Sequence, residues 1–121
     1  DPGRFELRLM DGSANPYLLQ ASVLAAGLDG LKNKINPGKP LNCNMYEDYE
    51  KYPNLQKLPD ELTQSLDKLK NNKDMNDAFG QSVLNSYIKL RNSEIKEFNQ
   101  KESFDKTKAI TRWERDNTLD C

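Results

Sequence analysis

The chain has 121 residues, which fits one domain of ordinary size or part of a larger one. Its 18 basic and 19 acidic side chains nearly balance, so the basic footprint of a nucleic-acid-binding protein is missing. No run approaches the roughly 18 consecutive apolar residues that indicate a membrane-spanning helix. We therefore expect neither a nucleic acid nor a membrane as a partner.

Residues 1–11 predict a strand. Polar and apolar side chains alternate from Arg4 to Met10, which is the period of a strand with one face in a core. The apolar row is Phe5, Leu7 and Leu9, and the polar row is Arg4, Glu6 and Arg8. A single strand cannot satisfy its backbone hydrogen bonds without neighbours. The pattern therefore predicts a sheet whose other strands lie upstream of these residues.

Residues 15–36 predict a core helix. Asn15 suits the N-cap and Pro16 the first helical position, where its missing N–H costs nothing. Steps of three and four residues place one apolar stripe on a single face: Tyr17, Ala21, Leu24, Leu28, Leu31 and Ile35. Pro37-Gly38 is a stop signal. We expect the ordered core to be concentrated in the first 35 residues.

The rest of the chain divides into three stretches. Residues 37–59 hold four of the six prolines and show no helical period, so they predict a long loop. Residues 60–99 predict helices, with a break at Gly80. Residues 100–121 are mainly polar and predict a C-terminal tail, in which we interpret Trp113 and Glu114 as packing residues.

The chain has two cysteines, Cys43 and Cys121, and no histidine. Two distant cysteines form neither a disulfide scaffold nor a metal knuckle, and a reducing cytoplasm is the default compartment for them. Without histidine, a Ser-His-Asp or Cys-His mechanism is excluded within these residues and a zinc site is disfavoured. Chemistry must come from carboxylates, arginines, lysines and backbone groups, or from parts of a site that lie elsewhere.

Arg4, Glu6 and Arg8 are the candidate site. Alternation on a strand points all three side chains to one side, with roughly 7 Å between successive ones. Two flanking cations favour an ionised carboxylate, which is a hard ligand for Mg²⁺ or Mn²⁺. Guanidinium groups suit phosphates and carboxylates. The alternative is a solvated sheet face with cross-strand ion pairs, and the pattern alone leaves both readings open.

Three blocks of sequence follow one another between residues 4 and 38. They are Arg4-Phe-Glu-Leu-Arg8, Asn15-Pro-Tyr-Leu18, and Ala26-Gly-Leu-Asp-Gly30 with Lys34-Ile35 and Pro37-Gly38 after it. Residues 4–38 closely resemble the C-terminal part of the catalytic domain of glutamine synthetases, and the likeness continues more loosely to Trp113-Glu114. We therefore expect an α+β parent catalytic domain. This chain would be a mostly α-helical portion of it, with one N-terminal strand belonging to an antiparallel sheet.

The resemblance implies an ATP-dependent ligase that joins ammonia to glutamate through a γ-glutamyl phosphate, as a cytoplasmic homo-oligomer using Mg²⁺ or Mn²⁺. It assigns metal binding to Glu6, binding of the glutamate substrate to Arg8, and nucleotide binding to Arg4. The family's other metal ligands lie outside these residues, and one carboxylate cannot hold Mg²⁺ tightly. We therefore expect the isolated chain to be inactive.

Three alternatives remain open at this point. Tyr46 falls where some bacterial members carry a regulatory tyrosine that is modified by a nucleotidyl group, or it is an ordinary loop tyrosine. The chain could be a non-catalytic fragment or pseudoenzyme that acts as an interaction module. It could also belong to a related ligase that joins glutamate to an amine other than ammonia.

Overall fold

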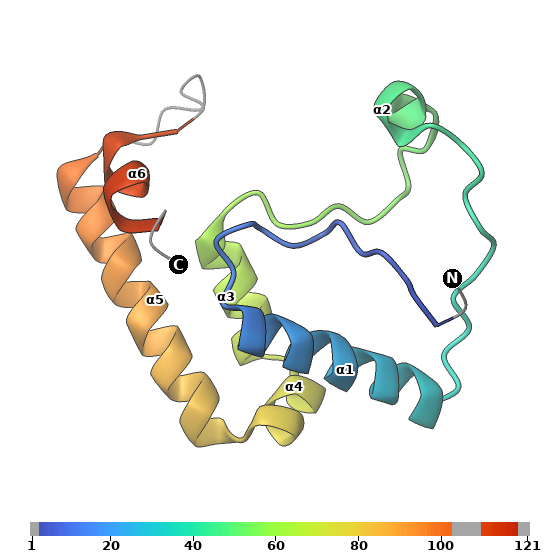
Figure 1. The fold of residues 1–121 in the computed structure, drawn as a ribbon, viewed down its shortest axis with the longest axis horizontal. Coiled ribbons are helices and arrows are strands. Elements are labelled where there is room, and N and C mark those ends of the chain that lie inside the picture. The colour runs from blue at the N-terminus through green and yellow to red at the C-terminus, as the bar shows by residue number, and fades with distance from the viewer. Residues whose placement is uncertain (1–2, 103–109, 119–121) are drawn as a thin grey trace.

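A computed structural model describes residues 3–102 and 110–118 (Figure 1). The helices are α1 (Pro16–Lys32), α2 (Met45–Asp48), a short 3₁₀ turn (Tyr49–Lys51), α3 (Leu62–Lys70), α4 (Lys73–Phe79), α5 (Gln81–Lys101) and α6 (Arg112–Thr118). Much of the predicted tail, including Cys121, lies outside the described residues. Within the described ranges, every helix is too short or too polar to cross a bilayer.

The predicted N-terminal strand in an antiparallel sheet is wrong. Residues 4–9 have no regular secondary structure, and the described part of the chain contains no strand and no sheet. A strand is stabilised by a ladder of hydrogen bonds to a neighbour, and residues 3–102 and 110–118 supply no such neighbour. The alternating apolar row consequently lies in solvent, and Phe5 is 76% exposed.

Helix α1 begins where the sequence predicts. The Asn15 side chain accepts hydrogen bonds from the backbone N–H groups of Tyr17 and Leu18, both at 3.1 Å, and Pro16 is the first helical residue. The helix ends before the predicted stop. Lys34 takes a left-handed φ of 52°, and the Ile35 N–H donates to the Gly30 carbonyl at 2.9 Å. These are the features of a Schellman C-cap.

The core lies between α3 and α5 rather than in the first 35 residues. Leu66 of α3 and Leu84 of α5 are its buried apolar side chains, each 5% exposed. Helix α4 connects these two helices and also packs against α1 (Figure 1). Near the C-terminus, Trp113 of α6 meets Phe98 of α5 edge to face, with 5.6 Å between ring centroids. The expectation of an N-terminal core is therefore wrong.

Helix α1 does not bury the predicted stripe. Its large apolar members are exposed, whereas Leu18, Leu19 and Val23, on other sides of the helix, are half-buried. The physical reason is that α1 is apolar nearly all round, so its side-chain pattern does not select one face for packing.

The segment 37–59 is not wholly irregular. Asn44 caps α2 by accepting a hydrogen bond from the Tyr46 N–H at 3.2 Å, and this short helical turn lies far from α4 and α5 (Figure 1). A cap of this kind can start one helical turn without any apolar period. Tyr46 is 90% exposed on that turn.

Candidate functional site

Arg4, Glu6 and Arg8, which we call the charged triplet, come together in space. The Nε of Arg8 donates to Oε1 of Glu6 at 2.5 Å, and Nη2 of Arg4 lies 3.9 Å from Oε2 of the same carboxylate. Each arginine thus engages a different oxygen of Glu6. The convergence expected from the alternation is present, although residues 4–9 do not form a strand.

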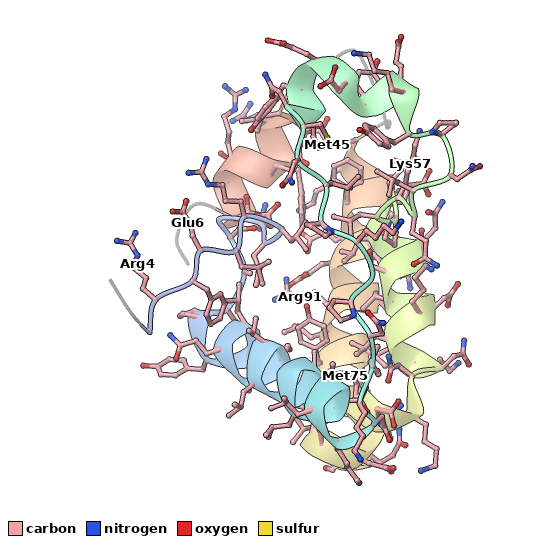
Figure 2. The ribbon with its side chains drawn as sticks, turned by 90° about the vertical axis from the view of Figure 1, so that its right-hand side faces the viewer. Arg4, Glu6, Met45, Lys57, Met75 and Arg91 are labelled. Atoms are coloured by element: carbon pink, nitrogen blue, oxygen red, sulfur yellow. The ribbon has the colours of Figure 1, made fainter. Side chains whose placement is uncertain are left out.

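The charged triplet is open to solvent. The side chains of Arg4, Glu6 and Arg8 are 74%, 55% and 79% exposed, and Figure 2 shows Arg4 and Glu6 pointing away from the helices. Ion pairs at such a surface contribute about 0–1 kcal/mol to stability. These charges therefore add little to the fold of the chain, and their groups are accessible to a ligand.

The charged triplet suits a divalent cation only in part. Glu6 is a carboxylate with two oxygens, which are ligand atoms that Mg²⁺ and Mn²⁺ prefer. Among the described residues, no three Cys, Asp or Glu side chains are arranged to hold a metal ion. By its chemistry Glu6 can supply one carboxylate ligand, and the described residues do not assemble a complete ligand set around it.

A hydrogen-bonded turn connects the charged triplet to α1. The Asp11 carboxylate accepts the N–H of Ser13 at 2.7 Å and its hydroxyl at 2.6 Å. The hydrogen bond from the Ser13 hydroxyl lowers the pKa of Asp11 below its ordinary value most strongly, and the bond from the Ser13 N–H lowers it further. The Asn15 cap follows directly, so residues 11–15 form a closed turn that fixes where the chain enters the helix.

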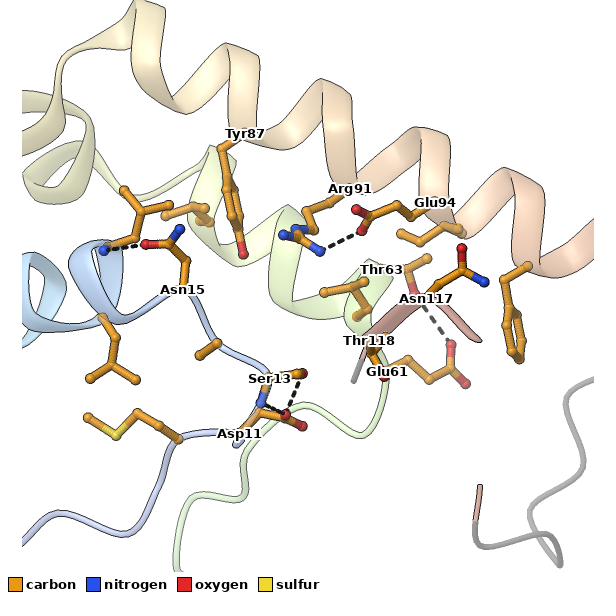
Figure 3. A pocket seen from close by; sticks show the side chains of 18 of the residues that line it. Asp11, Ser13, Asn15, Glu61, Thr63, Tyr87, Arg91, Glu94, Asn117 and Thr118 are labelled. Atoms are coloured by element: carbon orange, nitrogen blue, oxygen red, sulfur yellow. Dashed lines mark hydrogen bonds and ion pairs between the residues drawn. The ribbon is translucent and has the colours of Figure 1, made fainter. Parts of the chain in front are cut away.

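An open cavity of about 990 Å³ lies beside this turn, between the start of α1, α5 and α6 (Figure 3). The charged triplet does not line it. Arg91 projects into it from α5, pairs with Glu94 at 2.6 Å, and places its guanidinium carbon 5.3 Å from the ring centroid of Tyr87. The group formed by Tyr87, Arg91 and Glu94, which we call the Arg91 group, was not predicted from the sequence. The sequence feature that could have predicted it is the spacing of four and three residues between its members, which puts all three side chains on one side of a helix.

Trp113 packs against Phe98, as its interpretation as a packing residue expects, whereas Glu114 has a capping role that the sequence did not predict. Oε2 of Glu114 accepts the Thr111 N–H at 2.7 Å, and the Thr111 hydroxyl accepts the Glu114 N–H at 3.2 Å. This reciprocal arrangement is a capping box at the start of α6. The backbone N–H of Trp113 also donates to the Glu102 carboxylate at 3.2 Å, which ties α6 to the end of α5.

Sequence comparison decides the family. The sequence model described as the glutamine synthetase catalytic domain matches residues 1–117, which is nearly the whole chain. The chain belongs to the glutamine synthetase family. The charged triplet, the α1 cap and the Arg91 group all fall inside this glutamine synthetase match.

Individual glutamine synthetases give the same result. The chain is 39% identical over 119 residues to the protein from Rhizobium meliloti (strain 1021), a match that covers 98% of this chain and 26% of that protein. The Rhizobium leguminosarum bv. phaseoli protein is 37% identical over 119 residues, with the same coverage of each chain. The Methanosarcina mazei protein is 39% identical over 98 residues, covering 78% of this chain and 22% of its own length. The chain thus spans about a quarter of the length of these relatives.

Proposed function

We propose that this chain contributes to the active site of a glutamine synthetase that joins ammonia to the γ-carboxylate of glutamate. In this reaction, a γ-carboxylate oxygen of glutamate attacks the γ-phosphorus of ATP and ADP leaves. The nitrogen of ammonia then attacks the γ-carbonyl carbon of the γ-glutamyl phosphate, loses a proton and displaces phosphate. Family membership supports this ligase activity, and the charged triplet is the observation that carries the chain's part in it.

Each member of the charged triplet has a separate role in this proposal. Glu6 is one ligand of Mg²⁺ or Mn²⁺, and a bound cation neutralises charge on the transferring phosphoryl group. Arg8 binds a carboxylate of the glutamate substrate, and Arg4 binds a phosphate of the nucleotide. Both guanidiniums offer planar, two-pronged donors that match these groups.

The ion pairs within the charged triplet suit an exchange of partners. Arg8 and Glu6 are more than half exposed, so separating them costs about 1 kcal/mol or less. A metal ion can replace Arg8 on the Glu6 carboxylate, and the freed guanidinium can then take the substrate carboxylate. The pairing keeps the two side chains near one another until ligands arrive.

In the same proposal the full-length protein works in the cytoplasm as a homo-oligomer, and its substrates are glutamate, ammonia and ATP. Family membership supports this assignment. Among the described residues no three Cys, Asp or Glu side chains are arranged for a metal ion, so in this proposal Glu6 is one ligand of a larger set.

Isotope transfer tests the reaction. The full-length protein is supplied with ATP, ammonia and glutamate that carries ¹⁸O in its γ-carboxylate. We expect ammonia-dependent release of ADP and one ¹⁸O atom in each phosphate formed, because that oxygen bridges carbon and phosphorus in the intermediate. Phosphate without ¹⁸O would contradict the acyl phosphate. Turnover with an organic amine but not with ammonia would identify the related γ-glutamyl-amine ligase instead.

A further inference from the structure

The contact between Glu6 and Arg8 opposes the roles proposed for both residues. The Nε of Arg8 donates a charge-assisted hydrogen bond of 2.5 Å to Oε1 of Glu6, and Nη2 of Arg4 lies 3.9 Å from Oε2. A guanidinium therefore faces each oxygen of the one carboxylate. The oxygen that would bind a divalent cation and the guanidinium that would bind a substrate carboxylate are thus engaged with each other.

The Glu6–Arg8 contact contributes little to the fold. Residues 4–9 have no regular secondary structure for it to stabilise, and both side chains are exposed. Water and dissolved salt weaken an ion pair of this kind, so little free energy is needed to separate it. The consequence of the contact is therefore for ligand binding, because a ligand of either residue must first displace the other residue.

We propose that the Glu6–Arg8 contact is autoinhibitory: in the metal-free protein it withholds Arg8 from glutamate, and a divalent cation bound to Glu6 releases it. This inference rests on the proposed function, in which Glu6 is a metal ligand and Arg8 binds the substrate carboxylate. A cation on Glu6 repels the Arg8 guanidinium, which then binds the carboxylate of glutamate instead. By linkage, the metal and glutamate each raise the affinity for the other by the same factor.

The exposure of the pair sets the size of this coupling. Separating an exposed ion pair changes an equilibrium constant by at most about fivefold, and coupling between two binding sites is commonly about 5- to 150-fold. We therefore expect a factor near the lower end, about three- to tenfold. The factor should fall as ionic strength rises, since salt screens charges that are open to solvent.

Glutamate binding to the metal-free full-length protein, measured by titration calorimetry, tests the inference without turnover. Glu6→Gln frees Arg8 and should tighten glutamate binding about three- to tenfold, although it removes a proposed metal ligand. Arg8→Gln should weaken glutamate binding. In the Arg8→Gln background, Glu6→Gln should give no gain, which separates the release of Arg8 from a general loss of negative charge. Glu47→Gln, at an exposed carboxylate of α2, is the control and should leave the affinity unchanged.

The reciprocal effect is measured on the metal. Mn²⁺ binding to the full-length protein without glutamate is followed by electron paramagnetic resonance. Arg8→Gln should tighten Mn²⁺ binding about three- to tenfold, because the competitor for Glu6 is gone. Arg4→Gln removes the same charge but only a contact of 3.9 Å, so it should have a smaller effect. Equal effects of the two variants would assign the change to net charge and overturn the inference.

The glutamate titrations distinguish a failure of the inference from a failure of the proposed function. If Glu6→Gln left glutamate affinity unchanged, or raised it equally in the Arg8→Gln background, the autoinhibitory contact would be wrong and the role of Arg8 would stand. If Arg8→Gln did not weaken glutamate binding, the proposed role of Arg8 would be wrong and the inference would fail with it.

Discussion

At the scale of single residues, the two arginines of the charged triplet differ in how closely they contact the Glu6 carboxylate. Arg8 makes a short hydrogen bond of 2.5 Å, whereas Arg4 remains at 3.9 Å, a longer electrostatic contact. In the proposed reaction they also bind different substrates, Arg8 the glutamate and Arg4 the nucleotide. Replacing each by lysine should therefore affect different substrates, because lysine keeps the charge and loses the two-pronged geometry.

In the full-length protein, we expect Arg8→Lys to raise the KM for glutamate by roughly 10- to 100-fold, the equivalent of one charge-assisted hydrogen bond. The KM for ATP should change little. Arg4→Lys is the matched variant and should raise the KM for ATP instead. Steady-state kinetics with each substrate varied in turn measures both. An Arg8→Lys enzyme in which only the KM for ATP rises would show that the two roles are misassigned.

At the scale of the elements, α1 shows which features a sequence predicts. Its start was predictable because Asn15 and Pro16 act on the backbone within one turn. Its end was not, because the left-handed residue of the C-cap is Lys34, where glycine is the usual signal. A lysine in that conformation carries a steric cost that glycine does not.

Lys34→Gly should therefore stabilise the chain by about 0.5–1 kcal/mol, since glycine removes the clash of Cβ in the left-handed region. Chemical denaturation followed by circular dichroism measures the change. Lys32→Gly is the control, because Lys32 is the last residue of α1 and glycine is unfavourable within a helix. If Lys34→Gly also destabilised the chain, the C-cap would not be the one described.

The N-terminal segment shows where sequence reasoning fails. Alternation predicted that Arg4, Glu6 and Arg8 share one side, and their side chains do converge. Alternation also predicted a strand, but a strand depends on hydrogen-bond partners far away in the sequence, and the described residues supply none. The Arg91 group was not predicted because only the apolar residues of the α5 sequence were used to predict its packing.

At the scale of the whole molecule, the chain has little core. Leu66 and Leu84 are the buried apolar side chains among the described residues, and many large apolar side chains are exposed, including Leu24, Leu28 and Leu31 of α1. A domain of this length usually buries well over half of the surface that its unfolded chain exposes. The isolated chain should therefore be marginally stable, and its apolar surface should promote association.

We expect the isolated 121-residue chain to show no ligase activity, to unfold over a broad temperature range and to self-associate at micromolar concentration. Thermal melting by circular dichroism, sedimentation velocity and an ammonia-dependent ADP assay measure these three properties. A monomer that melts sharply and forms glutamine would contradict the view that the chain needs other parts of the protein.

The most direct test of the account is the activity of the full-length protein with Glu6→Ala. We predict loss of Mg²⁺-dependent, ammonia-dependent ADP release by at least about 100-fold, because loss of a metal ligand should exceed the 10- to 100-fold effect of changing its outer partners. Stability should stay within about 0.5 kcal/mol, as for other exposed positions. Glu47→Ala, an exposed carboxylate of α2, is the control and should keep full activity. A stable Glu6→Ala protein with normal activity would contradict the role of the charged triplet.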